Sequence, residues 1–239
     1  TPPPVSITLK KGPVAASAAA FGNSSFVFSI LDDVTVPVLD GVATFDDLPI
    51  YEGTLLTTEF TYSARNPNQR FILNNIGIDT DLLSVIVKAN EQSTQSVKYS
   101  LQDSLFSVKS DSKVYYIQEI EDERYELFFG DDVFGQALEE GNFITANYIV
   151  SNGDSANGVN NFAFSGKLTY TRNSVEYTVT DGISFVTTGL NASGGESIET
   201  ISSVKKYAPR IYSSQNRALT ADDYETLIPS KIYPETESI

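Results

Sequence analysis

Apolar residues recur at every second position along most of this chain, from Val5 to about Thr188, and many of them are β-branched or aromatic. Side chains of a β-strand alternate between two faces, so a period of two is typical of strands that bury one face. Gly, Asn, Asp and Pro clusters interrupt the pattern at short intervals and predict turns. The chain is therefore predicted to be mainly β, with antiparallel or mixed sheets.

The strongest runs predict individual strands over residues 26–30, 36–39, 42–45, 82–88, 97–101, 114–120, 125–129, 143–150, 167–171 and 175–179. Asp40 and Gly41 stand between two of these runs and favour a tight hairpin turn, because both residue types tolerate positive φ. Residues 121–124 predict a solvated turn, and residues 172–174 a second hairpin connection.

The pattern becomes helical after Asn191. Apolar residues between Glu196 and Ala208 recur at spacings of three and four, which places them on one helical face. These residues are Ile198, Ile201, Val204 and Ala208. Ser193 and Glu196 have the spacing of a capping box, and Pro209 is predicted to end this first helix.

A second short helix is predicted to begin near Thr220, whose hydroxyl can cap it. Leu219 can pack on Tyr224 as a hydrophobic staple, and Pro229 keeps the helix short. The expected fold is thus mainly β with a smaller α+β C-terminal part, in which two short helices follow the sheets.

These changes of pattern divide the chain into three parts. Residues 1–4 contain three consecutive prolines and predict an extended linker. Residues 5–147 are predicted to form one or more β-rich domains, with a sub-boundary near residues 51–60. Residues 148–239 are predicted to form the α+β part. The sequence is expected to be a fragment that is truncated at its C-terminus, because the last residues carry no partner element of their own.

Composition excludes several classes of chemistry. The chain has no Cys and no His, so thiolate or imidazole catalysis and the usual zinc sites are not expected within it. Its 16 Lys and Arg against 31 Asp and Glu give a net charge of −15, which disfavours nucleic acid as a partner. No apolar run approaches the roughly 20 residues needed to cross a membrane. We expect no enzyme, no cofactor and no small-molecule substrate.

Carboxylates are the remaining candidates for a catalytic or metal site. Adjacent acidic pairs occur at residues 32–33, 46–47, 131–132 and 139–140. Neighbouring residues of a strand point to opposite faces, so solvated turns are the better interpretation of these pairs. Asp79 and Asp81 could share one side of an extended segment and bind a cation, although a turn is the simpler reading. No catalytic, cofactor-binding or metal residue is therefore assigned.

Several runs together resemble one known family. Residues 128–135, which include the sequence FGDDVFG, and residues 141–148 and 152–159 resemble corresponding runs of the baseplate J-like family. Residues 194–199, 205–209 and 215–224 resemble the same family's glycine-rich and NRA-type signature. Residues 65–71 and 231–235 extend the resemblance to wedge subunits of T4-like contractile-tailed phages. The signature positions are Gly194, Gly195, Glu196, Arg217, Thr220, Asp223 and Tyr224.

The resemblance implies a structural protein of the virion, located in the tail baseplate and assembled in the host cytoplasm. It implies partners of two kinds: other copies of the chain, as a homodimer or in ring contacts, and other baseplate wedge subunits. The baseplate ring would rearrange when the tail sheath contracts. The signature positions are interpreted as fold-defining, and we expect Arg217 to bond the turn at residues 193–199 and hold the two helices together.

Two other functions fit the same residues. A receptor-binding or glycan-binding β module of a tail fibre would share the β content and the acidity. A glycan hydrolase that uses two carboxylates would need no His. Saccharide binding by a monomer would favour the first alternative, and turnover abolished by one Asp or Glu substitution would favour the second.

Overall fold

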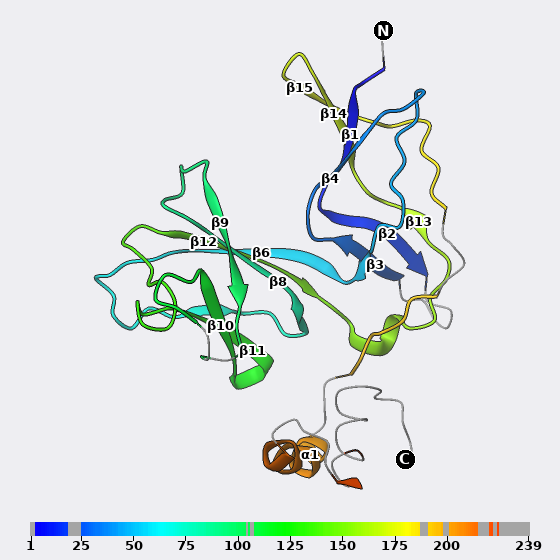
Figure 1. Ribbon diagram of the computed structural model, residues 1–239. Helices are drawn as coiled ribbons and strands as arrows, with labels where there is room; N and C mark the ends of the chain where they lie inside the picture. Colours follow the sequence, from blue (N-terminus) through cyan, green and yellow to red (C-terminus); the bar gives the residue numbers. More distant parts are fainter. Residues whose placement is uncertain are drawn as a thin grey trace. The chain divides into compact units, whose positions relative to one another are not determined.

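A computed structural model of the protein describes residues 3–18, 25–103, 105, 108–186, 191–197, 201–214, 220, 221 and 224. The chain divides into two compact units, Thr1–Gly195 and Glu196–Ile239. Strands fill the described part of the first unit, and a helix lies in the second (Figure 1). The prediction of a mainly β chain with a helical C-terminal part is confirmed.

Two four-stranded antiparallel sheets contain the first strands of the chain. One has the order β15-β14-β1-β4 and consists of β1 (Ser6–Leu9), β4 (Val34–Pro37), β14 (Leu168–Arg172) and β15 (Val175–Thr178). The other has the order β13-β2-β3-β5 and consists of β2 (Gly12–Ala18), β3 (Ser25–Ile30), β5 (Tyr51–Glu52) and β13 (Ala163–Phe164). Leu9, Val14, Ile30 and Leu168 form a shared core cluster.

A seven-stranded sheet with the order β6-β12-β8-β9-β10-β11-β7 makes up the rest of the first unit's strands. Its strands are β6 (Thr54–Thr61), β7 (Phe71–Leu73), β8 (Ile78–Lys88), β9 (Ser96–Leu101), β10 (Val114–Ile120), β11 (Arg124–Phe129) and β12 (Phe143–Val150). The β9–β10 pair is parallel and the other pairs are antiparallel. The sheet is therefore mixed, and β6 and β7 lie at its two edges.

The core of this sheet follows from the alternation in its central strands. Leu83, Val85 and Val87 of β8 point to one face and are buried there, while the residues between them are half-buried. The edge strands pack on the same core: the rings of Phe60 in β6 and Phe71 in β7 lie edge to face with centroids 5.5 Å apart. The sheet thus curls until side chains from its two edges meet.

A large bulge interrupts the pairing of β8 with β12. Ser84 lies opposite Asn147 but Asp79 lies opposite Ile149, so the four residues between Asp79 and Ser84 face Tyr148 alone. The Tyr115 hydroxyl donates to the Leu83 carbonyl at 3.1 Å inside this bulge. Burial raises the pKa of Tyr115 to about 12, so its hydroxyl stays a donor at neutral pH.

A sharp change of direction at Gly53 connects the small sheets to the large one. The Gly53 amide donates to Val27 of β3 at 2.8 Å, and its carbonyl accepts from the buried Ser29 hydroxyl at 2.8 Å. Next to it, the Glu52 carboxylate accepts from the Asn152 amide at 2.9 Å, just beyond the end of β12. One continuous backbone therefore leaves β5 in one sheet and enters β6 in another.

Both predicted hairpin turns are confirmed. Leu39 and Val42 exchange backbone hydrogen bonds of 2.8 and 2.9 Å around Asp40 and Gly41, whose φ values of 51° and 82° are positive. The predicted strand at residues 42–45 is wrong, because Val42 forms an isolated bridge and no described neighbouring strand pairs with the residues after it.

Helix α1 (Ile201–Ser214) corrects the predicted first helix at both ends. Glu196 and Ser197 lie outside a helix, and the helix continues through Pro209 instead of ending there. A proline inside a helix removes one backbone hydrogen bond, and the turns on either side can still form. Ile201 and Val204 of the predicted apolar face are exposed.

The second predicted helix is described at few positions. Ala221 and Tyr224 are helical, and the Tyr224 amide donates to the Thr220 carbonyl at 3.2 Å. The remainder of that prediction lies outside the described residues. None of the helices in the described part of the chain has the length and hydrophobicity to cross a membrane.

Candidate functional site

The loop at residues 130–137, which contains most of the FGDDVFG motif, is built around two carboxylates. Asp131 Oδ1 accepts from the amides of Val133 and Phe134 at 3.1 and 2.8 Å. Asp132 Oδ1 accepts from the Ala137 amide at 2.9 Å. These bonds lower the pKa of the Asp131 carboxyl, first through Phe134 and then through Val133. The acidic pair is therefore structural and fixes the shape of the 130–137 loop.

Glycine is needed at both ends of this loop. A Cβ atom on Gly130 would overlap the backbone of Gly135, and Gly135 has a φ of 96°. Gly130 also forms a bridge with Ala137. The spacing of the two glycines in the motif thus reflects close contact of two backbone segments.

The 130–137 loop presents apolar side chains to solvent. Val133 is 61% exposed and Phe134 is 42% exposed, and Phe128 at the end of β11 is 40% exposed. Tyr116 lies opposite Phe128 in the β10–β11 pair, and its hydroxyl donates to the Phe134 carbonyl at 3.2 Å. These four residues form one aromatic-rich surface, named here the loop surface.

Replacing Asp131 with Ala is expected to loosen the loop surface and leave the sheet intact. The amides of Val133 and Phe134 lose their shared acceptor, so we expect their hydrogen exchange to become at least about tenfold faster. Amides of β12 should keep their exchange rates. Asp131→Asn retains an acceptor oxygen and is the matched control. Unchanged exchange in Asp131→Ala would contradict this account of the loop.

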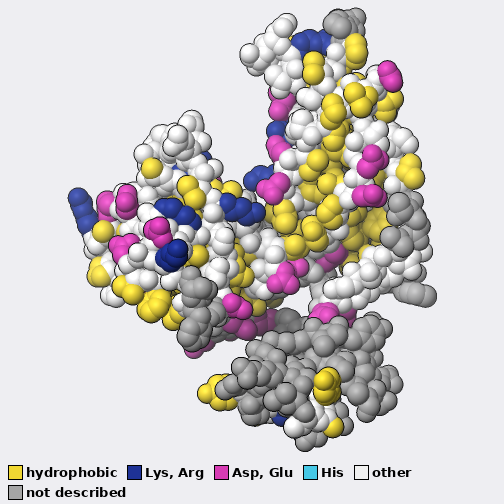
Figure 2. Space-filling view, viewed as in Figure 1, with side chains coloured by type: hydrophobic (Ala, Val, Ile, Leu, Met, Phe, Trp, Pro, Cys, Tyr) yellow, Lys and Arg dark blue, Asp and Glu magenta, His cyan; other side chains and the backbone are white. Residues whose placement is uncertain are grey.

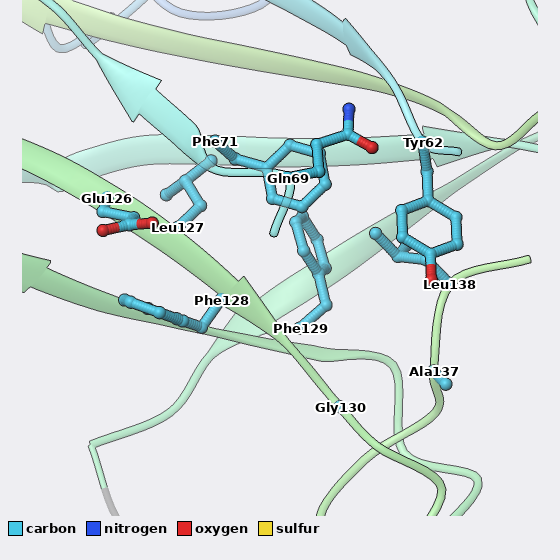
Figure 3. Close-up of a pocket in the computed structure, with 10 residues that line it drawn as sticks. All are labelled: Tyr62, Gln69, Phe71, Glu126, Leu127, Phe128, Phe129, Gly130, Ala137 and Leu138. Atoms are coloured by element: carbon cyan, nitrogen blue, oxygen red, sulfur yellow. The ribbon is translucent and has the colours of Figure 1, made fainter. Parts of the chain in front are cut away.

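A cavity of about 180 Å³ lies beside the loop, near the place where β6 and β7 approach each other. Its walls combine aromatic, aliphatic and polar side chains: Tyr62, Gln69, Phe71, Glu126, Leu127, Phe128, Phe129, Gly130, Ala137 and Leu138. Figure 3 shows Tyr62 and Leu138 on one side and Glu126 and Phe128 on the other. The cavity is large enough for one aliphatic or aromatic side chain.

Glu126 is the one carboxylate that lines this cavity. Glu126 is 6% exposed, and its two carboxylate oxygens accept hydrogen bonds from Arg70 Nε and Nη2 at 2.8 and 2.5 Å. The hydrogen bonds from Arg70 lower the pKa of Glu126 against the opposing effect of burial. A carboxylate bound in this way is neither a raised-pKa acid nor a free nucleophile, so a two-carboxylate hydrolase gains no support from this cavity.

The other acidic candidates accept hydrogen bonds from nearby groups. Asp79 Oδ1 accepts from the Asp81 amide at 3.0 Å within the bulge of strand β8. Asp33 accepts from Lys10 Nζ at 2.9 Å, and Glu140 accepts from the Ala64 amide at 2.5 Å. No group of three or more acidic side chains that could hold a metal ion is found in the described ranges.

The signature residue Gly195 lies against the segment that follows β12. Asn157 bonds the Gly195 backbone twice, accepting from its amide at 3.0 Å and donating to its carbonyl at 2.8 Å. A Cβ atom on Gly195 would overlap the Gly153 carbonyl, and Gly194 has a φ of 86°. Glu196 is exposed.

The remaining signature positions belong to the second unit. Thr220 and Tyr224 are described and exposed, whereas Arg217 and Asp223 lie outside the described residues. The proposed contact of Arg217 with the turn at residues 193–199 therefore stays a prediction. Gln69 and Arg70 belong to the run at residues 65–71 that carries the family resemblance, whereas Glu126 was not predicted, because its partner Arg70 is 56 residues away.

Comparison with known proteins shows what this chain is similar to. Residues 54–156, which contain the sheet from β6 to β12 and the loop surface, match the family described as the third domain of bacteriophage baseplate wedge protein gp6. The chain is similar to baseplate wedge proteins. Baseplate wedge protein gp6 of Enterobacteria phage T4 is 26% identical over 204 residues, which is 78% of this chain and 29% of that protein.

Both matches are to proteins described as baseplate wedge proteins. The chain spans less than a third of the length of the curated relative. The baseplate J-like resemblance is a different family name, and it stays a prediction.

Proposed function

We propose that this chain is a structural part of a contractile-tail baseplate wedge that self-associates and binds other wedge subunits. In this role it helps to build the baseplate ring that rearranges on sheath contraction, and it catalyses no reaction. The similarity of residues 54–156 to a baseplate wedge domain carries this proposal.

The loop surface supports self-association. Figure 2 shows Asp and Glu side chains spread over the visible face, and a chain with a net charge of −15 repels its copies. At the loop, both carboxylates accept hydrogen bonds from the loop's own amides. These bonds hold the two carboxylates against the loop backbone and leave Val133 and Phe134 exposed as an apolar contact, which is why we assign the self-contact to this surface.

The solution mass of the 239-residue chain tests the proposal. Sedimentation at physiological salt is expected to give a dimer or larger species, and adding neighbouring wedge subunits should give a heavier complex. Val133→Lys should shift the chain towards monomer by placing a charge in the apolar contact. A chain that stays monomeric alone and with wedge subunits, or that binds saccharide as a monomer, would overturn the proposal.

Val42→Lys is the matched control for this measurement. Val42 is 62% exposed, nearly the same as Val133 at 61%, and it lies in the hairpin turn of a different sheet. The same substitution at Val42 should leave the mass unchanged. Equal effects at the two positions would show that added charge alone, rather than the loop surface, changes association.

A further inference from the structure

Within the described residues, the outer edge of β6 carries backbone groups that bond no other strand. In an antiparallel pair, successive residues point their N–H and C=O groups alternately towards and away from the partner strand. The Tyr62 amide donates to Asn142 at 2.9 Å, on the β12 side, and the register is continuous from Thr61 back to Thr54. Leu55, Thr57 and Glu59 therefore direct their backbone groups away from β12.

Contacts at both ends of β6 confirm this direction. The Gly53 amide, two residues before Leu55, donates to β3 on the side away from β12. At the other end, the Thr61 carbonyl accepts from Gln69 Nε2 at 2.7 Å, and the Ser63 amide donates to Gln69 Oε1 at 2.9 Å. Between these contacts, no described residue bonds the outward backbone groups of Leu55, Thr57 or Glu59.

The Gln69 side chain shows what this edge can bind. Its amide presents one donor and one acceptor to residue 61, the last residue of β6, and to residue 63 just beyond it, as a peptide group of a neighbouring strand would. At one end of the β6 edge, the Gln69 side chain thus already takes the place of a neighbouring strand. The outward backbone groups of Leu55, Thr57 and Glu59 lie along the same edge.

Apart from the charge of Glu59, the β6 edge lacks the features that usually protect exposed edges. Natural edge strands are short, carry Pro or charged residues such as Lys, or contain a bulge. β6 has eight residues with the sequence TLLTTEFT, and its pairing with β12 is regular. The edge strands β7 and β15 have three and four residues, and the edge strand β4 contains Pro37.

We propose that the outer edge of β6 binds an extended segment of another protein by β-strand addition. Side chains along β6 determine the chemistry of that segment. Leu56 and Phe60 face the core, whereas Thr57 and Glu59 are exposed on the other face. A segment that alternates β-branched residues with Lys or Arg would place its apolar side chains beside Leu56 and Phe60 and its positive charges beside Glu59.

Charge selects another protein over a second copy. Two copies would bring two chains of net charge −15 together along an edge that itself contains Glu59. A basic segment reduces this charge instead. The inference rests on the proposed function only for the source of the segment, which is a neighbouring wedge subunit.

Hydrogen exchange of the full 239-residue chain tests the inference with a peptide of about eight residues in which Lys alternates with Val. In the free protein, the amides of Thr57 and Glu59 should exchange rapidly, while those of Thr58 and Phe60 are protected by β12. Saturating peptide should slow exchange at Thr57 and Glu59 by at least about tenfold. A peptide in which Glu alternates with Val should have little effect.

Substitutions at Glu59 separate the backbone contribution from the charge. Glu59→Pro removes an outward N–H that β12 does not use, so the sheet should remain and peptide affinity should fall at least about tenfold. Glu59→Gln keeps the N–H and should lose only about two- to threefold. Glu59→Lys also keeps it and should prefer the Glu peptide, so this variant decides the test if Glu59→Pro unfolds.

Three results would overturn the inference. They are unchanged exchange at Thr57 and Glu59 with the Lys peptide, equal peptide affinity of Glu59→Pro and the parent, and protection of both amides by self-association alone. The mass measurement distinguishes this failure from failure of the assembly role. If the parent chain binds wedge subunits but not the Lys peptide, only the strand-addition inference is contradicted. If it binds the Lys peptide but neither self-associates nor binds wedge subunits, only the assembly role is contradicted.

Discussion

Replacing Gly53 with Ala is expected to lower the free energy of unfolding by about 3 kcal/mol or more. Gly53 has a φ of 121°, which L side chains rarely adopt, and an added Cβ would overlap the Val150 carbonyl and lie 2.5 Å from Ile149 Cγ2. The backbone cannot move away easily, because both Gly53 polar groups are bonded to β3. Urea unfolding monitored by circular dichroism measures the loss.

Gly12→Ala is the control for backbone conformation. Gly12 has a similar φ of 108°, but no atom lies within 4 Å of an added Cβ. Its substitution should lower the free energy of unfolding by about 1 kcal/mol from conformation alone. If both substitutions lowered the free energy of unfolding by similar amounts, the close approach of Gly53 to β12 would not contribute to the effect of Gly53→Ala.

Replacing Arg70 with Met is expected to lower the thermal unfolding midpoint at pH 7 by roughly 5 to 10 °C. The substitution leaves the Glu126 carboxylate in a site where it is 6% exposed and without its bidentate partner. Calorimetry of the purified chain measures the shift. Arg70→Lys keeps the positive charge but cannot bond both carboxylate oxygens in the bidentate geometry of Arg, so its unfolding midpoint should lie between those of the parent and Arg70→Met.

The effect of Arg70→Met should depend on pH in a defined direction. In the folded parent the pKa of Glu126 lies below its ordinary value of 4.5. The stabilisation from the ionised pair is therefore present above about pH 4.5 and is lost as pH falls through the folded pKa. The difference between parent and Arg70→Met should narrow in acid. A difference that is constant from pH 7 to pH 3 would contradict a role for the carboxylate charge.

Local sequence was sufficient to predict most strands and turns. The alternation in residues 82–88 and 143–150 predicted β8 and β12, because each strand buries one face in a common core. Asp40 with Gly41 and residues 172–174 predicted turns, because positive φ is a local requirement. Pro209 misled the helix prediction, because the rule that proline ends a helix is a preference that flanking turns can override.

The candidate surfaces depended on contacts that a single sequence does not show. Arg70 and Glu126 are 56 residues apart, and Gln69 meets the end of β6 because the chain turns back within eight residues. Alternation indicates which face of a strand is buried, but it does not indicate which strand lies at an edge. The acidic pair at residues 131–132 was predicted to lie in a solvated turn, and the exposure of Phe134 follows from the geometry of the Asp131 turn.

The continuous path from β5 into β6 has a mechanical consequence. A load applied to the small sheets reaches the large sheet through two neighbouring backbone connections, Gly53 before β6 and residues 151–162 after β12, and the Glu52 side chain bonds the Asn152 amide between them. Both connections enter the large sheet at the same end of the β6–β12 pair, because Thr54 lies opposite Val150. A load is therefore divided between two strands that eight register pairs hold together.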